Sequence, residues 1–447
     1  MFMEKEKNIA RYALEYALKN GCQQARVVLS TGEENEVEVR DGRVDKLHHS
    51  GGCQLSLSLF VDGSYSLIST NRLEIEEIEH FIDKGIMGTR FLAKDPYRSL
   101  PETEMYYRGD MNDFGLYDEG FKTVDVDEKI GVAKRIFEEI TDDRLQSTDD
   151  SLSAGKVISA MAAIADTETY NYLIDSNGFE GEKSRTLFIS MSQVSVMGED
   201  DERPEDYCYA NAQHWANLKK EGVGAEALQR SVAKIGASRV ESGVYNVVVD
   251  RRVASQLVNP LMSAIMGEAL HMKSSFLLDK KGEKIASDRL TIMDNPRQHG
   301  VSGARLFDNE GIAVVGMPIV ENGVLKNYYI SNYMSKKMGV EMTQGTSTIL
   351  DFALGDFDTA ELIRNMGNGL YITDFNGGNC NGTTGDFSYG IEGFWVEKGV
   401  IVKPVSGMLM TGNMLELWNN LVDTSNDPLG YTTRKVPSLL FTEVVVN

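Results

Sequence analysis

The stretch GLYITDFNGGNCNGTTGDFSYGIEGFWVEKGVIVKPVSGMLMTGNMLELW, residues 369–418, decides the fold of the last third of the chain. Its apolar runs Phe394–Glu397 and Val400–Lys403 flank a turn at Gly399, which predicts a β-hairpin. Upstream, Asn322-Gly323 separates two further apolar runs and predicts another hairpin. Strands and helices do not alternate regularly along the chain. The pattern therefore predicts an α+β fold rather than a parallel α/β sheet.

The glycine-rich segment at residues 377–388 is the most unusual part of this stretch. It is not a phosphate-binding P-loop, because no Lys follows the glycines and the spacing differs. Glycine here indicates positive φ or close approach of another backbone, so the segment is either a tight β corner or a peptide-binding loop. The second interpretation gives these candidate substrate-binding residues: Gly377, Gly378, Gly385, Asp386, Phe387, Ser388 and, at a second Gly-Asn spot, Asn413.

Working outward, the chain divides into three predicted units. Residues 1–95 form an N-terminal α-β domain, in which a helix is followed by four strands and a second helix. A proline-containing linker leads to a middle α+β domain at residues 115–225. A β-rich C-terminal domain covers residues 230–447. In that last unit, Asn246–Val249 is a predicted strand and Asp250 is placed to cap one following helix, bent at Pro260, whose apolar positions recur at helical spacing: Val253, Leu257, Leu261, Ile265 and Ala269.

Charge and cysteine content limit the functional classes. The formal net charge of the 447 residues is -22. This acidic balance disfavours direct nucleic-acid binding, which depends on Lys and Arg neutralising phosphates. The four cysteines are scattered and none has a neighbour at zinc-site spacing, which is typical of a protein from a reducing compartment. Charged residues stand where the apolar run of a signal peptide would begin, and no apolar stretch is long enough for a membrane span. We expect a cytoplasmic protein.

Side-chain chemistry alone gives only weak catalytic candidates. No His-Glu-x-x-His motif occurs among the six histidines. Glu268 and His271 lie three residues apart, a spacing that places two side chains on one helix face, but a metal site needs further ligands. A lone polar pair is the plainer interpretation. Cys380 has no evident base beside it in the sequence, and a spectator thiol is the plainer interpretation there as well.

Three further stretches carry a resemblance to a known family. VEVRDGRVDKLHHSGGCQLSLSLFVDG resembles the opening strands of the TldD/PmbA metallopeptidase family, some of whose members are called modulators of DNA gyrase. SFLLDKKGEKIASDRLTI and YYISNYMSKKMGV, followed by residues 369–418, are similar in order and spacing to the PmbA/TldE-like branch of that family. The resemblance covers nearly the whole chain.

The resemblance also implies a lost metal site. The catalytic branch of the family carries His-Glu-x-x-x-His on a helix, where two imidazoles bind Zn²⁺ and the Glu acts as general base. With the register fixed by the downstream Lys-Gly pair, the comparable residues are Gly267, Glu268 and Met272. Only the Glu is retained, and His271 falls one position short, which turns it about 100° from the ligand face. The catalytic branch also uses a Cys near its C-terminus, and no Cys follows Cys380.

The family therefore implies a non-catalytic subunit with no metal or cofactor of its own. Its expected partner is a TldD-type zinc peptidase homologue, in a homodimeric or heterodimeric assembly that cleaves small or unfolded peptides, such as peptide-antibiotic precursors and antitoxins. Two alternatives stay open. One is a regulatory protein that modulates DNA gyrase through protein contacts. The other is a self-sufficient peptidase with a metal site shifted to Glu268 and His271.

Overall fold

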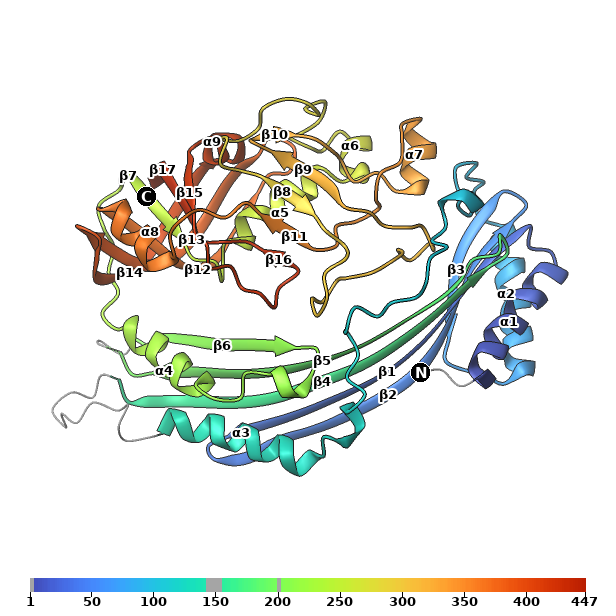
Figure 1. Cartoon of the computed structure of the whole chain (residues 1–447), viewed down its shortest axis with the longest axis horizontal. Helices are drawn as coiled ribbons and strands as arrows, with labels where there is room; N and C mark the ends of the chain where they lie inside the picture. Colours follow the sequence, from blue (N-terminus) through green and yellow to red (C-terminus); the bar gives the residue numbers. More distant parts are fainter. Residues whose placement is uncertain (1–3, 142–154, 199–201) are drawn as a thin grey trace.

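A long antiparallel sheet and a separate C-terminal part make up the molecule. The computed structural model describes residues 4–141, 155–198 and 202–447. In Figure 1 the long sheet curves beneath the C-terminal part. The α+β class is confirmed. Within the described ranges, no helix combines the length and the apolar character that crossing a membrane requires.

The long sheet has the strand order β3-β2-β1-β4-β5-β6. Asp41-Gly42 and Asp62-Gly63 form the two predicted turns, and both positions of each have positive φ, which suits Asp and Gly in tight hairpins. Three strands, not the predicted four, precede the second helix, because two of them are unusually long. The six strands are β1 Gln24–Arg40, β2 Arg43–Val61, β3 Ser64–Thr70, β4 Val157–Asp175, β5 Glu180–Val196 and β6 Glu205–Ala212.

The first two predicted units share this sheet. Strand β1 from residues 1–95 pairs with β4 from residues 115–225 in one unbroken register, from Arg26 opposite Asp175 to Arg40 opposite Met161. Local sequence patterns do not reveal which strands pair, so they could not show that the two units share a sheet. The two segments thus form one continuous layer.

Four helices cover one face of this layer (Figure 1). Alternate residues of β1, including Val27, Leu29, Val37 and Val39, are buried against them, as the two-residue period of a strand requires. The helices form two pairs, α1 with α2 and α3 with α4. Their bounds are α1 Glu4–Lys19, α2 Ile75–Arg90, α3 Val126–Thr141 and α4 Val223–Ala233.

The opposite face of the sheet meets the linker and a loop of the C-terminal part. Val28 and Leu173 from the sheet pack with Phe114 of the linker and Phe307 of the loop. The amide of Tyr107 donates a hydrogen bond of 3.0 Å to the carbonyl of Gly311. The linker is therefore held between the sheet and the C-terminal part.

The C-terminal part is built around a ring of strands. Its order is β14-β13-β12-β7-β17, and β14 also pairs with β17, which closes the ring, while β15 adds to β17. Most of the largest apolar core lies within and beside this ring. The strands are β7 Gly243–Val249, β12 Gly369–Cys380, β13 Asp386–Glu397, β14 Val400–Asn413, β15 Leu421–Thr424 and β17 Leu439–Val446.

A small second sheet and five helices surround the ring. The sheet contains β8 Ile292–Asp294, β9 Met317–Glu321, β10 Val324–Leu325, β11 Leu350–Phe352 and β16 Arg434–Lys435. The helices are α5 Ser255–Ala264, α6 Gly267–His271, α7 Asn332–Met338, α8 Thr359–Met366 and α9 Met414–Asn419.

The helix predicted to run from Val253 to Ala269 is instead two helices. Helix α5 ends at Ala264, and Met266 adopts an extended conformation before α6 begins. Met266 forms a β-bridge with Tyr329, so a strand-like contact replaces helical hydrogen bonds at this point. Asp250 does not cap α5. Its carboxylate accepts from the amide and the Nε of Arg252.

Candidate functional site

Helix α6 carries the residues at which the family resemblance implies a lost metal site. The amide of Gly267 donates a hydrogen bond of 2.8 Å to the carbonyl of Tyr329, which fixes the start of the helix. Leu270 is buried in a small apolar cluster with Ile330 and Met334 of the neighbouring α7 segment. The short helix is thus anchored by its first residue and by one apolar side chain.

The side chains of α6 do not form a metal site. Glu268 and His271 are exposed, and Met272, directly after the helix, is 68% exposed. A Cβ at position 267 would lie 3.1 Å from the Cβ of Met334 and 3.2 Å from the Tyr329 carbonyl oxygen. Met334 would therefore have to shift by a few tenths of an ångström to admit a side chain at position 267. Among residues 4–141, 155–198 and 202–447, no group of three or more His, Cys, Asp or Glu gathers as metal ligands would.

The glycine-rich segment forms the hairpin between β12 and β13, and it lies beside the segment that follows α6. The amide of Phe276 donates to the carbonyl of Gly382 at 2.8 Å. A Cβ at Gly385 would lie 3.2 Å from the Phe276 ring. The structure thus brings the two sets of predicted site residues into one region, although they are more than a hundred residues apart in the sequence.

The glycines of this hairpin have different roles. Gly378 has a φ of +101°, and a Cβ there would lie 2.0 Å from the carbonyl oxygen of Ser388, so it permits a close backbone contact inside the hairpin. Gly377 has a φ of +128°, and a Cβ there would meet nothing within 4 Å. The tight-corner interpretation therefore describes Gly378. Only Gly377 leaves open space beside the backbone for another chain.

The remaining candidates of the hairpin are tied into the fold to different extents. The Nδ2 of Asn413 donates to the Thr384 carbonyl and to Asp386 Oδ1, both at 2.9 Å. Hydrogen bonds from Asn413 and from the Thr384 hydroxyl lower the pKa of Asp386. Phe387 is buried and stacks on Tyr389, whereas Ser388 is half-buried. Phe387 thus supports the core, and Asp386 is the exposed carboxylate of the hairpin.

Cys380 lies at the end of β12 in a half-buried position. Burial and the nearby Asp386 raise the pKa of its thiol. A raised pKa disfavours the nucleophilic thiolate. The geometry therefore agrees with a spectator thiol.

Sequence analysis missed a cleft between the long sheet and the C-terminal part. It has a volume of about 1010 Å³ and is lined mainly by three segments that are far apart in the chain, with Tyr170 and Asn171 of β4 beside them. These are the linker around Tyr117, the start of β5 from Glu182 to Arg185, and the loop from Gly303 to Asn309. A second hollow of about 360 Å³ shares Asn171, Lys183 and Phe307 with it. No short motif signals this site, because only the tertiary fold brings the three segments together.

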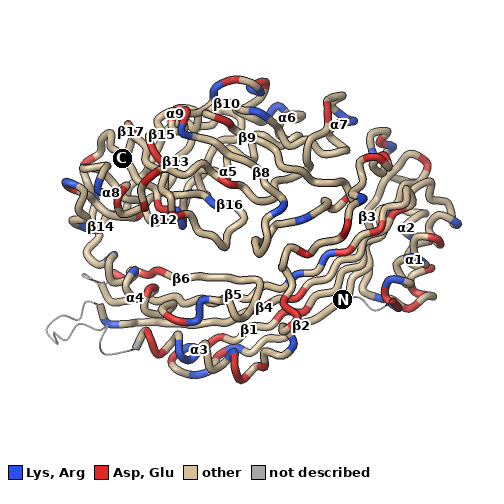
Figure 2. The backbone as a smooth tube through the Cα atoms, viewed as in Figure 1, with Lys and Arg blue, Asp and Glu red and all other residues tan. Residues whose placement is uncertain are grey.

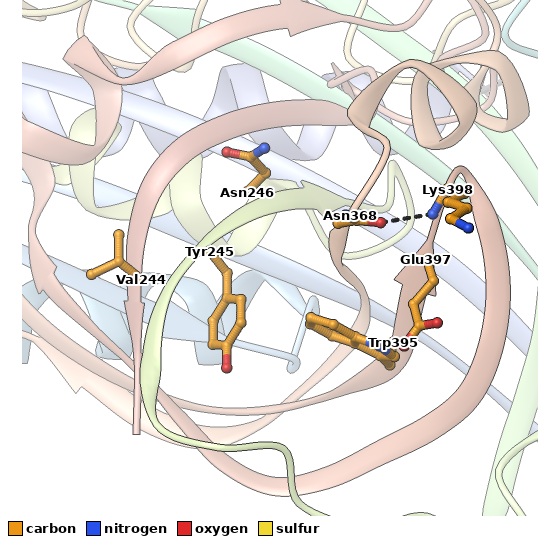
Figure 3. Close-up of a pocket in the computed structure, with 7 residues that line it drawn as sticks. All are labelled: Val244, Tyr245, Asn246, Asn368, Trp395, Glu397 and Lys398. Atoms are coloured by element: carbon orange, nitrogen blue, oxygen red, sulfur yellow. Dashed lines mark hydrogen bonds between the residues drawn. The ribbon is translucent and has the colours of Figure 1, made fainter.

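A third, shallower hollow of about 470 Å³ lies on the ring of strands, away from the segments just described (Figure 3). The hollow lies at the start of β12, where the neighbouring strands β7 and β13 continue past Gly369. Tyr245 and Trp395 meet edge to face at 5.5 Å, and Trp395 Nε1 donates to Glu397 at 2.8 Å. Its polar groups are largely paired, so it offers less for ligand recognition than the cleft.

Comparison with known proteins gives matches along most of the chain. Models of the PmbA/TldA metallopeptidase family match with domain 1 at residues 25–87, the central domain at residues 119–235 and the C-terminal domain at residues 242–447. The metalloprotease PmbA of Escherichia coli O157:H7 is 26% identical over 434 residues, which cover 95% of this chain and 93% of that protein.

Solved structures agree with these matches. A crystal structure from Bacteroides thetaiotaomicron, of a protein whose name links it to modulation of DNA gyrase, is 44% identical. It superposes with a TM-score of 0.96 and covers 100% of both chains. TldE from Thermococcus kodakarensis has the same fold, with a TM-score of 0.83 at 18% identity over 98% of this chain and 99% of that one.

Proposed function

Because the chain belongs to the PmbA/TldD metallopeptidase family, we propose that it is the non-catalytic, PmbA/TldE-type subunit of a cytoplasmic peptidase assembly. In this proposal a TldD-type homologue carries the zinc. The two chains pair as a heterodimer or higher assembly, and this chain helps to hold small or unfolded peptides near the partner's metal. Peptide-antibiotic precursors and antitoxins are the substrates that the family resemblance suggests.

The observation that carries the proposal is the chemistry of α6. A catalytic zinc needs three protein ligands and an open position for water. Gly267 offers no donor atom and Met272 offers only a thioether, which is poorly suited to Zn²⁺. Glu268 and His271 would supply two donors at most. The residues present therefore do not fit a catalytic zinc, and no hydrolytic step is assigned to this chain.

The test is a peptidase assay with three samples: this chain alone, a TldD-type homologue from the same cell alone, and the two mixed. We expect cleavage only where the homologue is present, and faster cleavage in the mixture. Elemental analysis of this chain alone separates the proposal from the self-sufficient peptidase. One tightly held zinc per chain, lost in Glu268→Gln and His271→Ala, would support that alternative.

A second candidate function is modulation of DNA gyrase through protein contacts. The 44% identity to a protein with that name favours it. Figure 2 shows acidic positions over both parts of the molecule, and the net charge of -22 disfavours direct binding to the DNA itself. Capture of partners from cell extract on the tagged chain distinguishes the two functions, since one predicts the zinc homologue and the other predicts gyrase.

A further inference from the structure

The cleft between the long sheet and the C-terminal part contains an open strand edge. The amide of Thr186 in β5 points away from β4 and donates to the carbonyl of Leu116 at 2.9 Å. Backbone groups of alternate residues point to the same side of a strand. Those of Ser184 and Glu182 therefore point away from β4 as well, toward the cleft that both residues line.

Among the described residues, no other strand covers this edge. Strand β6 pairs with β5 only from Phe188 onward, and the linker pairs at Thr186. Within the described part of the chain, the amides of Ser184 and Glu182 have no hydrogen-bond acceptor. An unpaired strand edge is a template for an additional strand, and an extended peptide can supply one.

Three cations converge on the same cleft. Lys183 Nζ donates to the carbonyls of Phe307 at 2.7 Å and Asp308 at 3.1 Å. Arg185 Nε donates to the Thr169 hydroxyl at 3.1 Å, and Arg305 Nη2 donates to the Ser347 carbonyl at 3.0 Å. These hydrogen-bond partners are neutral oxygens. The Asp308 carboxylate lies close enough to favour the charged form of Lys183, and Asp294 and Asp308 favour that of Arg305, but neither is within ion-pair distance.

None of the three cations is paired with a carboxylate. Within residues 4–141, 155–198 and 202–447, neither Lys183, Arg185 nor Arg305 forms an ion pair, although the chain carries a net charge of -22. Arg305 Nε is buried without an acceptor. Figure 2 shows basic positions on loops of the C-terminal part that face the sheet. Asp113, Glu119 and Glu182 also line the cleft, but within the described residues none of them forms an ion pair with the three cations, which stay available to a carboxylate of a ligand.

We propose that the cleft binds an extended peptide segment that adds to the edge of β5 and places a carboxylate against Lys183, Arg185 and Arg305. Apolar walls from Leu116, Leu306 and Phe307 accommodate the side chains of the peptide. The carboxylate is either the C-terminus of the peptide or an acidic side chain. This inference rests on the proposed function in one respect, that the chain binds peptides. It adds where the peptide binds and that a carboxylate is preferred.

Burial of Lys183 supports an anionic ligand. Desolvation and the neighbouring Arg305 lower the pKa of Lys183 to about 8. A bound carboxylate offsets both effects and favours the charged amine. Binding of an anion is thus coupled to the charged form of Lys183.

The test uses the full chain without any partner and measures fluorescence anisotropy with four labelled pentapeptides of one apolar core sequence. One has a free C-terminal carboxylate, the second is its C-terminal amide, and the third and fourth are amides that carry an internal Glu or Gln. Lys183→Met and Arg185→Gln are compared with Lys284→Gln, an exposed control in a surface ion pair with Asp288. Melting curves establish that each variant is folded.

We expect at least one carboxylate peptide to bind about tenfold more tightly than its neutral counterpart. A difference in affinity between the acid and its amide would show that the C-terminal carboxylate is bound. A difference between the Glu and Gln peptides would show that an acidic side chain is bound. Lys183→Met and Arg185→Gln should each remove most of that preference, and Lys284→Gln should not. Equal binding of charged and neutral peptides, folded variants that keep the preference, or no binding up to about 1 mM would overturn the inference.

Failure of this inference and failure of the proposed function give different results. The chain can stimulate the zinc homologue while the cleft variants bind normally, which would refute only the inference. The cleft can also bind carboxylate peptides when no stimulation is found, which would refute only the proposed function.

Discussion

The amide of Gly267 donates a 2.8 Å hydrogen bond to the carbonyl of Tyr329 and thereby sets the first residue of α6 against the α7 segment. A side chain at position 267 would be crowded, because its Cβ would lie 3.1 Å from the Cβ of Met334. The loss of the first metal ligand is therefore accompanied by neighbouring packing that would have to shift to readmit it.

Restoring the two histidines alone should not restore zinc binding. In Gly267→His with Met272→His, we expect less than about 0.1 zinc per chain after dialysis, because a third ligand is missing and Met334 crowds the first imidazole. Elemental analysis of the folded double variant checks this. Stoichiometric zinc in that variant would show that the absence of the two histidines alone accounts for the loss of the metal site. The Met272→His single variant is the matched control.

Asn413→Ala should raise the pKa of Asp386 toward its ordinary value of 3.8, because the variant removes the largest hydrogen bond that lowers it. Because the pKa of Asp386 is lowered in the folded chain, its ionised form stabilises the fold at pH values above the unfolded pKa. That contribution is lost as the pH falls through the folded pKa. Carboxyl NMR titration of wild type and variant measures the shift. An unchanged pKa would show that the Thr384 hydroxyl alone is responsible.

Carboxylate binding in the cleft should weaken as the pH rises through about 8, where Lys183 loses its charge. Arg305, Arg185 and Asp308 are the charged groups that influence it, and the two arginines keep their charge over this range. We expect the affinity of the preferred carboxylate peptide to fall several-fold between about pH 7 and pH 9, and to stay flat in Lys183→Met. A pH profile that is the same in both proteins would exclude Lys183 as the titrating group.

Lys234 ties the long sheet to the ring of strands. Its Nζ lies 3.1 Å from Asp206 in β6 and 3.2 Å from Glu392 in β13, and the side chain is only 11% exposed. Lys234→Met should lower the free energy of unfolding by about 2 kcal/mol, because these two carboxylates and Asp374, 3.8 Å away, lose their counter-ion. Denaturant unfolding measures the difference.

The matched control for this prediction is Lys284→Met, which breaks an exposed pair with Asp288. It should cost less than about 0.5 kcal/mol. If both variants were equally stable, Lys234 would not hold the two parts together.

Much of the fold could be predicted from local sequence. Asp41-Gly42, Asp62-Gly63 and Asn322-Gly323 all form the expected hairpins, because turn chemistry acts over a few residues. The break between Ala264 and Gly267 could not be predicted, since its cause is a bridge to Tyr329 more than sixty residues away. Non-local pairing likewise merged the first two units into one sheet.

The candidate site was predicted only in part. The resemblance pointed to α6 and the glycine pattern pointed to the hairpin, and the structure places the two side by side. It also shows that Phe387 is buried and that Gly378 serves the hairpin itself. The cleft with Lys183, Arg185 and Arg305 had no sequence signal, because an unpaired strand edge exists only in the folded chain.

The central claim is that this chain supports peptide cleavage without performing it. The most direct measurement compares cleavage of a small unfolded peptide by a TldD-type homologue from the same cell, with and without an equimolar amount of this chain. We expect no cleavage by this chain alone, even with added zinc. In the mixture we expect a cleavage rate at least about tenfold higher than with the homologue alone. Cleavage by this chain alone, abolished by a chelator and by Glu268→Gln, would contradict it.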